Sequence, residues 1–282
     1  MKKLNKAQVA TILFGGFFIF ILFLFPKLSS DDQMVTEVMA EKPVEDSHNH
    51  DLRESVSLSD SAKQIVADLE NQLSNVKSSE EKLIILDSLI NFASSEKQPV
   101  LMADFFKEKA KILQSEDAWM QTGDIFFKTF RFSDADGHVV IEEAINSYEE
   151  VLALNPNNLA AKTALGVCYV EGAGALGEAP MKGIGLLMEV LTIDSNNIDA
   201  LINLGYFSIQ STQYDKAIER FNKVLEIDPE NAEAYLYMTD LYVQMGDIEK
   251  GLSYLERYKS FQKDPLVVAQ VDAYIEELKI KK

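Results

Sequence analysis

The chain of 282 residues holds 45 acidic and 27 basic residues and has a formal net charge of −18. An acidic surface repels phosphate backbones, so the composition argues against nucleic-acid binding. The single cysteine, Cys168, excludes an internal disulfide and a metal cluster held by several thiolates.

The first element is an apolar segment near the N-terminus. Residues 7–25, AQVATILFGGFFIFILFLF, carry no charge, and a helix of this length approaches the roughly 30 Å hydrocarbon core of a bilayer. Lysines at positions 2, 3 and 6 precede it, so the positive-inside rule places residues 1–6 in the cytoplasm. The sequence predicts a transmembrane signal anchor over residues 7–26 with the C-terminal domain outside, which is the periplasm for a Gram-negative inner membrane.

A cleaved signal peptide is the alternative for this segment. The apolar run is longer than the roughly 7–15 residues of a signal-peptide core, and no small-residue cleavage motif follows it. No cysteine lies directly after the apolar run either, which excludes a lipoprotein anchor. These features favour the uncleaved anchor, in which Thr11 and Gly15 form a small-residue pair that would allow two such helices to approach.

Residues 27–58 are acidic, lack hydrophobic periodicity and contain no large aromatic residue. This composition predicts a flexible tether. His48, His50 and Asp51 lie close together in it, but two histidines in an unstructured segment make a weak metal site. We interpret them as solvated residues and predict no metal site.

Helical periodicity begins after the tether. Apolar residues recur at helical spacing at Ile65, Val66, Leu69 and Leu73. No stretch beyond the tether alternates as a half-buried strand would, so the sequence predicts an all-α fold. Residues 59–115 are predicted to form N-terminal helices or a degenerate repeat of the pattern that follows.

A repeated pattern then covers residues 116–263. A small residue recurs at the start of a second helix, with 34 residues from Gly183 to Ala217 and 34 more to Gly251. Three of the second helices end in similar turns, LNPNN, IDSNN and IDPEN, whose polar residues can cap the next helix. The first helices of the four copies share a motif that starts at Trp119, Lys162, Leu201 and Tyr235.

These residues resemble the tetratricopeptide repeat, a helix–turn–helix unit of 34 residues. The resemblance implies a helical solenoid with four repeats over residues 116–263. Residues 264–282 place their apolar side chains on one face, as a capping helix would. The repeat that matches the family most fully runs from Asp199 to Pro229, with the motif residues Leu204, Gly205, Ala217, Phe221 and Pro229.

The stretch VEGAGALGEAPMKG, residues 170–183, contains the G-x-G-x-x-G pattern of dinucleotide-binding loops. It follows a predicted helix and no strand, so the context that such a loop needs is missing. The register instead predicts a five-residue insertion in the turn between two helices of one repeat, with glycines accepting positive φ.

The preceding repeat is longer by nine residues between Phe126 and Ala144. We expect this insertion, FRFSDADG, to lie in the equivalent turn. Its Asp134 and Asp136 resemble the start of a calcium loop, but the rest of that loop is missing, so calcium binding is not predicted.

In this family the first helices line a concave groove that holds the partner. No lysine or asparagine occupies the corresponding positions here, which argues against clamping a C-terminal carboxylate. The groove is apolar with two acids, so the resemblance implies an apolar or basic peptide. Carried over by register, the groove residues are Met120, Asp124, Phe127, Thr163, Val167, Val170, Ile202, Tyr206, Ile209, Leu236, Asp240 and Val243.

No nucleophile has a base at a recognisable spacing, and no cofactor-binding motif stands in the structural context that it needs. The sequence therefore predicts a non-enzymatic, membrane-anchored bacterial tetratricopeptide repeat scaffold that recruits another protein. One alternative is a self-assembling structural component of the cell envelope, which would be a homo-oligomer. Another is an accessory of cytochrome c maturation or envelope assembly, by analogy alone.

Overall fold

The computed structural model describes residues 56–132 and 136–281. The predicted cytoplasmic tail, the transmembrane segment and nearly all of the tether lie outside these residues. Within them the chain folds into helices and turns without a strand, which confirms the predicted all-α class. None of these helices combines the length and the apolar content that crossing a bilayer requires.

Three helices precede the repeats. Ser59 caps the first of them by accepting a hydrogen bond from the backbone N–H of Ala62 at 3.2 Å. Leu86, Leu89 and Phe105 are buried where the second and third pack together. The third helix also packs against the first repeat, so the repeats stack on the pair formed by the second and third helices. The bounds are α2 (Asp60–Asn75), α3 (Ser79–Ser95) and α4 (Pro99–Leu113).

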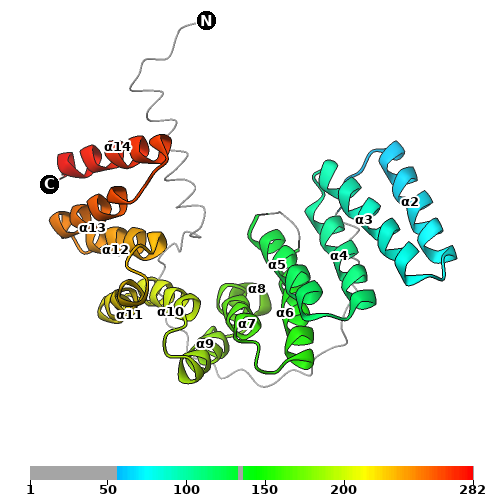
Figure 1. Cartoon of the computed structure of the whole chain (residues 1–282), viewed down its shortest axis with the longest axis horizontal. Coiled ribbons are helices and arrows are strands. Elements are labelled where there is room, and N and C mark those ends of the chain that lie inside the picture. The colour runs from blue at the N-terminus through cyan, green and yellow to red at the C-terminus, as the bar shows by residue number, and fades with distance from the viewer. Residues whose placement is uncertain (1–55, 133–135, 282) are drawn as a thin grey trace, which may run out of the picture. The chain divides into compact units, whose positions relative to one another are not determined.

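The four repeats are antiparallel helix pairs, each packed on the next (Figure 1). Glycine or alanine at the crossing of a pair lets a large side chain of the partner helix fit. At Gly205, for example, an added Cβ would lie 2.7 Å from the ring of Phe221. The pairs are α5 (Glu116–Phe132) with α6 (Gly137–Leu154), α7 (Leu159–Glu171) with α9 (Met181–Ile193), α10 (Ile198–Gln210) with α11 (Tyr214–Ile227), and α12 (Ala232–Gln244) with α13 (Ile248–Ser260).

The turns between repeats confirm the capping predicted from their polar residues. Asn158, Asn197 and Asn231 each precede a first helix, and each side chain accepts a hydrogen bond from the backbone N–H three residues later, at 2.9, 3.0 and 3.0 Å. Such caps satisfy backbone donors that a helix start leaves without a partner.

The prediction that the extra residues of the first repeat lie in a turn was wrong. Helix α5 continues to Phe132 and α6 begins at Gly137, so most of the extra residues lengthen the two helices. Phe130 packs against the core of this repeat, and this contact stabilises the extended end of α5. Asp136 caps α6 and accepts a hydrogen bond from the backbone N–H of His138 at 3.0 Å.

The insertion of the second repeat lies in the turn as predicted, but it contains a further short helix, α8 (Ala173–Leu176). Gly177 ends α8 with a φ of 66°, as expected for a glycine in this turn. Gly172 differs, because its φ is −80°. It is small for another reason: an added Cβ would lie 2.5 Å from Cγ1 of Ile141.

The last helix, α14 (Pro265–Lys281), packs on the last repeat, in the segment where the sequence predicts a capping helix. Val271, Ile275 and Leu278 are buried against Leu255 of α13. An open end of the stack would leave this apolar surface in water, and α14 covers it.

Candidate partner-binding face

The predicted groove residues of α5 lie along one side of that helix. Met120 and Phe127 are half-buried, whereas Asp124 is exposed. The carboxylate of Asp124 accepts a hydrogen bond from the hydroxyl of Tyr148 at 2.7 Å. Helix α6 therefore fixes the position of an exposed acid on α5.

The predicted residues of α7 and α10 differ in how accessible they are. Val170 and Tyr206 are half-buried. The others pack between neighbouring helices, where a partner would not reach most of their surface. These buried side chains are Thr163, Val167, Ile202 and Ile209, each 5 to 8% exposed.

The predicted residues of α12 lie against the C-terminal helix. Leu236 and Val243 join the apolar cluster formed by α13 and α14. Burial raises the pKa of Asp240 to about 6. Its carboxylate also contributes to the raised pKa of Tyr274 on α14, after burial of that phenol. This end of the predicted groove is therefore occupied by the chain's own last helix.

An arginine and a glutamate join the ends of α5 and α7. The Nε of Arg131 donates to Oε2 of Glu171 at 2.7 Å, and a second guanidinium nitrogen pairs with Oε1 of the same carboxylate. Such two-pronged pairs are the most directional that these groups form. The guanidinium carbon also lies 4.4 Å from the centre of the Phe127 ring, so the cation is held on an aromatic face.

Two tyrosines of the next repeats extend this arrangement. The rings of Tyr206 on α10 and Tyr237 on α12 are 5.7 Å apart, and Tyr237 stacks on Phe221 at 5.2 Å. We call Phe127, Arg131, Glu171, Tyr206 and Tyr237 the Arg131 cluster.

Charge links the members of the cluster across four helices, α5, α7, α10 and α12. Burial raises the pKa of Tyr206 to about 12; the Glu171 carboxylate adds to this and Arg131 opposes it. Burial likewise raises the pKa of Tyr237, with Glu233 adding to it and Arg131 opposing it.

Acids outnumber the single arginine around the cluster. The pKa of Glu233 is raised by its partial loss of hydration, and the Asp199 carboxylate adds to the rise. A hydrogen bond with the Tyr237 hydroxyl and the charge of Arg131 act in the opposite direction. With Asp124 and Glu171 also nearby, this face is aromatic and negatively charged.

Sequence reasoning did not select Arg131, Glu171 or Tyr237. Arg131 follows Phe127 by four residues, so it lies one turn further along the predicted face, in the part of α5 where the sequence predicts a turn insertion. The helical period through Phe130 was the signal that would have revealed it. Glu171 and Tyr237 directly follow predicted positions, and only the packing of the repeats turns them toward Arg131.

Cys168 is fully buried, and its burial raises the pKa of the thiol, so the nucleophilic thiolate is disfavoured. Between residues 56 and 281, leaving aside 133–135, no three His, Cys, Asp or Glu side chains group closely enough to hold a metal ion. His48 and His50 lie outside the described residues.

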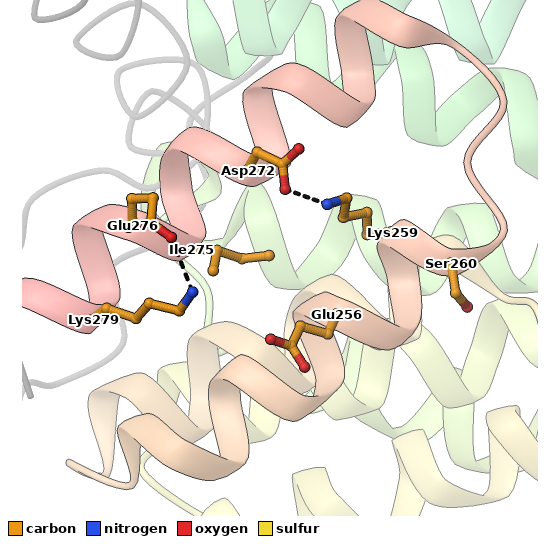
Figure 2. A pocket seen from close by; sticks show the side chains of 7 residues that line it. All are labelled: Glu256, Lys259, Ser260, Asp272, Ile275, Glu276 and Lys279. Carbon is orange, nitrogen blue, oxygen red and sulfur yellow. Dashed lines mark hydrogen bonds and ion pairs between the residues drawn. The ribbon is translucent and has the colours of Figure 1, made fainter.

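A surface depression of about 400 Å³ lies between α13 and α14. Figure 2 shows two ion pairs in it, Lys259 with Asp272 and Lys279 with Glu276 at 2.9 Å, and the carboxylate of Glu256 on α13 beside them. Ile275 lies between these pairs and is buried. Because the charges of the pairs compensate one another, we interpret the depression as the seam between the last repeat and its cap.

Comparison with known proteins agrees with this architecture. Residues 208–270 match the tetratricopeptide repeat family model, and a comparison with curated proteins gives no match. A solved tetratricopeptide repeat protein from Parabacteroides merdae ATCC 43184 is 13% identical, with 78% of this chain and 80% of that chain covered and a TM-score of 0.54. A thermophilic tetratricopeptide repeat protein of Thermus thermophilus is 14% identical, with 72% and 100% covered and a TM-score of 0.51.

A third solved structure is PilW, described as a widely conserved type IV pilus biogenesis factor. It is 16% identical, with 70% of this chain and 85% of that chain covered and a TM-score of 0.50. At these identities the likeness is one of fold. Residues 208–270 therefore match the tetratricopeptide repeat family directly, and the described helices as a whole share the fold of solved tetratricopeptide repeat proteins.

Proposed function

We propose that this protein is a membrane-tethered, non-enzymatic scaffold that recruits a partner protein through the Arg131 cluster. The family match supports the general class, because these repeats are protein-interaction modules. The apolar residues 7–26, the preceding lysines and the acidic tether support an anchor with the repeats outside the cytoplasm.

The observation that carries the proposal is the combination of aromatic rings and excess acid in the Arg131 cluster and around it. Apolar side chains of a peptide can pack on the rings of Tyr206 and Tyr237. A lysine or arginine beside them would pair with Glu233 or Asp124, because the ion pair of Arg131 is with Glu171. The partner segment is therefore apolar with basic residues, because an acidic segment would meet like charge.

The test reverses charge on this face without touching the core. Asp199 and Glu233 lie in the first turns of α10 and α12, and both are exposed. The full chain carrying Asp199→Lys and Glu233→Lys is compared with wild type by affinity purification from native membranes and quantitative mass spectrometry. We expect the partner to be lost at least tenfold.

A matched control carries Glu81→Lys and Glu249→Lys. These acids are also exposed first-turn residues, of α3 and α13, so the change in net charge and the effect on the helix dipoles are equal. The control should retain the partner. Equal capture by both variants would refute the proposed face, and equal loss would show that only overall charge matters.

The membrane tether is tested separately. Alkaline carbonate should leave the full chain in the membrane fraction, and protease added to sealed spheroplasts should digest residues beyond 58. Release by carbonate would exclude the anchor, and protection from protease would reverse the proposed orientation.

A further inference from the structure

The outer face of α9 differs from those of the other second helices. Aligned on their small crossing residues, the four second helices present the same four outward positions. In α6, α11 and α13 these positions carry acids or other polar groups in eleven of twelve cases and alanine in one, Ala153. The outward residues of α9 are Met181, Gly185, Met188 and Thr192, and none is charged.

This face is open to solvent. The side chains of Met181 and Met188 are 67% and 47% exposed. The two charged residues of α9 are held at its flanks by α7: Lys182 lies 3.6 Å from the centre of the Tyr169 ring, and Glu189 pairs with Lys162. Neither covers the methionines, so an apolar strip runs along the helix.

Gly185 lies between the two methionines, one turn after Met181. A Cβ added there would meet no atom within 4 Å, so packing inside this chain does not require a glycine. Glycine in a helix interior is less stable than alanine. Its presence gives a notch in the helix surface, which a second backbone can approach closely.

We propose that the outer face of α9 is a second docking site, which binds an amphipathic helix of a partner protein with an apolar stripe and basic flanks. Methionines suit such a surface because they adapt to varied apolar side chains. The notch at Gly185 would hold the closest approach of the two helices. This site is separate from the Arg131 cluster, which lies on the first helices.

Charge decides the kind of occupant. The second helices on either side in the array carry outward acids, Glu142 and Glu149 on α6 and Asp215 and Glu219 on α11. A second copy of this chain would bring acid against acid. A helix with lysine or arginine beside its apolar stripe would instead be attracted to the outward acids of α6 and of α11.

The test uses the full chain in phosphatidylcholine nanodiscs. The probe is a fluorescent 18-residue peptide of leucine and lysine, with leucines at helical spacing, and binding is followed by anisotropy. Met181→Glu with Met188→Glu gives α9 the residues that α6 and α13 carry at these positions. We expect at least tenfold weaker binding, although the added acid would strengthen a purely electrostatic attraction.

The control adds two glutamates at exposed outward positions of other second helices, Asn146→Glu and Ser253→Glu, and should bind as tightly as wild type or more tightly. Gly185→Gln, which fills the notch without a clash, should also weaken binding while the thermal midpoint stays equal or rises. Binding of the methionine variant at wild-type strength, or no binding by wild type, would overturn the proposal. So would a concentration-dependent dimer, or binding of free phosphatidylcholine vesicles, that the methionine variant abolishes.

Discussion

Gly183 of α9 lies directly against the backbone of Gly166 on α7. A Cβ at Gly183 would stand 2.2 Å from the carbonyl oxygen of Gly166 and 2.7 Å from Cγ2 of Val170. The two helices are therefore in backbone contact at this crossing, and the second repeat depends on the absence of a side chain there.

Gly183→Ala should destabilise the protein by about 1–3 kcal/mol. The clash forces the helices apart, and its free-energy cost exceeds the gain in helix propensity from alanine. Gly185→Ala is the matched control, two residues along the same helix with open space around the new methyl group. It should stabilise by roughly 0.5–1 kcal/mol. Urea unfolding followed by circular dichroism compares the two, and equal shifts would contradict the close approach.

The pair formed by Arg131 and Glu171 should show measurable coupling. Arg131→Met keeps the length of the side chain over Phe127 and removes the charge, and Glu171→Gln removes the other charge. Because the pair is two-pronged and its side chains are only 35% and 21% exposed, we expect a coupling of about 1 kcal/mol from the double-mutant cycle. A coupling near zero would show that the pair contributes orientation without stability.

Asp240 should make stability depend on pH. Its folded pKa of about 6 lies above the ordinary value of 3.8, so the folded protein binds this proton more tightly than the unfolded chain. Wild type then loses stability relative to Asp240→Asn as pH rises from 4 to 6. We expect the variant to be more stable by about 3 kcal/mol at pH 7.5, and the two proteins to converge near pH 4. Urea titrations across this range measure the difference, and a constant difference would exclude a raised pKa.

Removal of one inter-repeat cap should weaken the array locally. Asn197→Ala deletes the side chain that accepts the N–H of Ala200 at 3.0 Å, at a cost of about 1 kcal/mol. Asn196→Ala, its exposed neighbour, removes no such bond and should change stability by less than about 0.5 kcal/mol. Hydrogen exchange at the start of α10 should accelerate only in the first variant.

The sequence by itself determined the main helices, their pairing and their order, but neither the short α8 nor the extension of α5 and α6. Contacts within a repeat join residues close in the chain, such as Gly205 and Phe221, and the same spacing recurs in each copy. Small crossing residues and asparagine caps act locally, so their pattern can be recognised in the sequence alone. The cap α14 was also predictable, because its apolar residues share one face.

Other features depended on how distant residues meet. Arg131 and Glu171 are 40 residues apart, and their contact requires both the extension of α5 and the angle between two repeats. The sequence pattern does not show that four predicted groove residues are buried, or that Asp240 faces α14, because both follow from the packing of neighbouring helices. The period in the sequence therefore determined the fold, whereas the tertiary structure alone decided which side chains of each helix remain open to a partner.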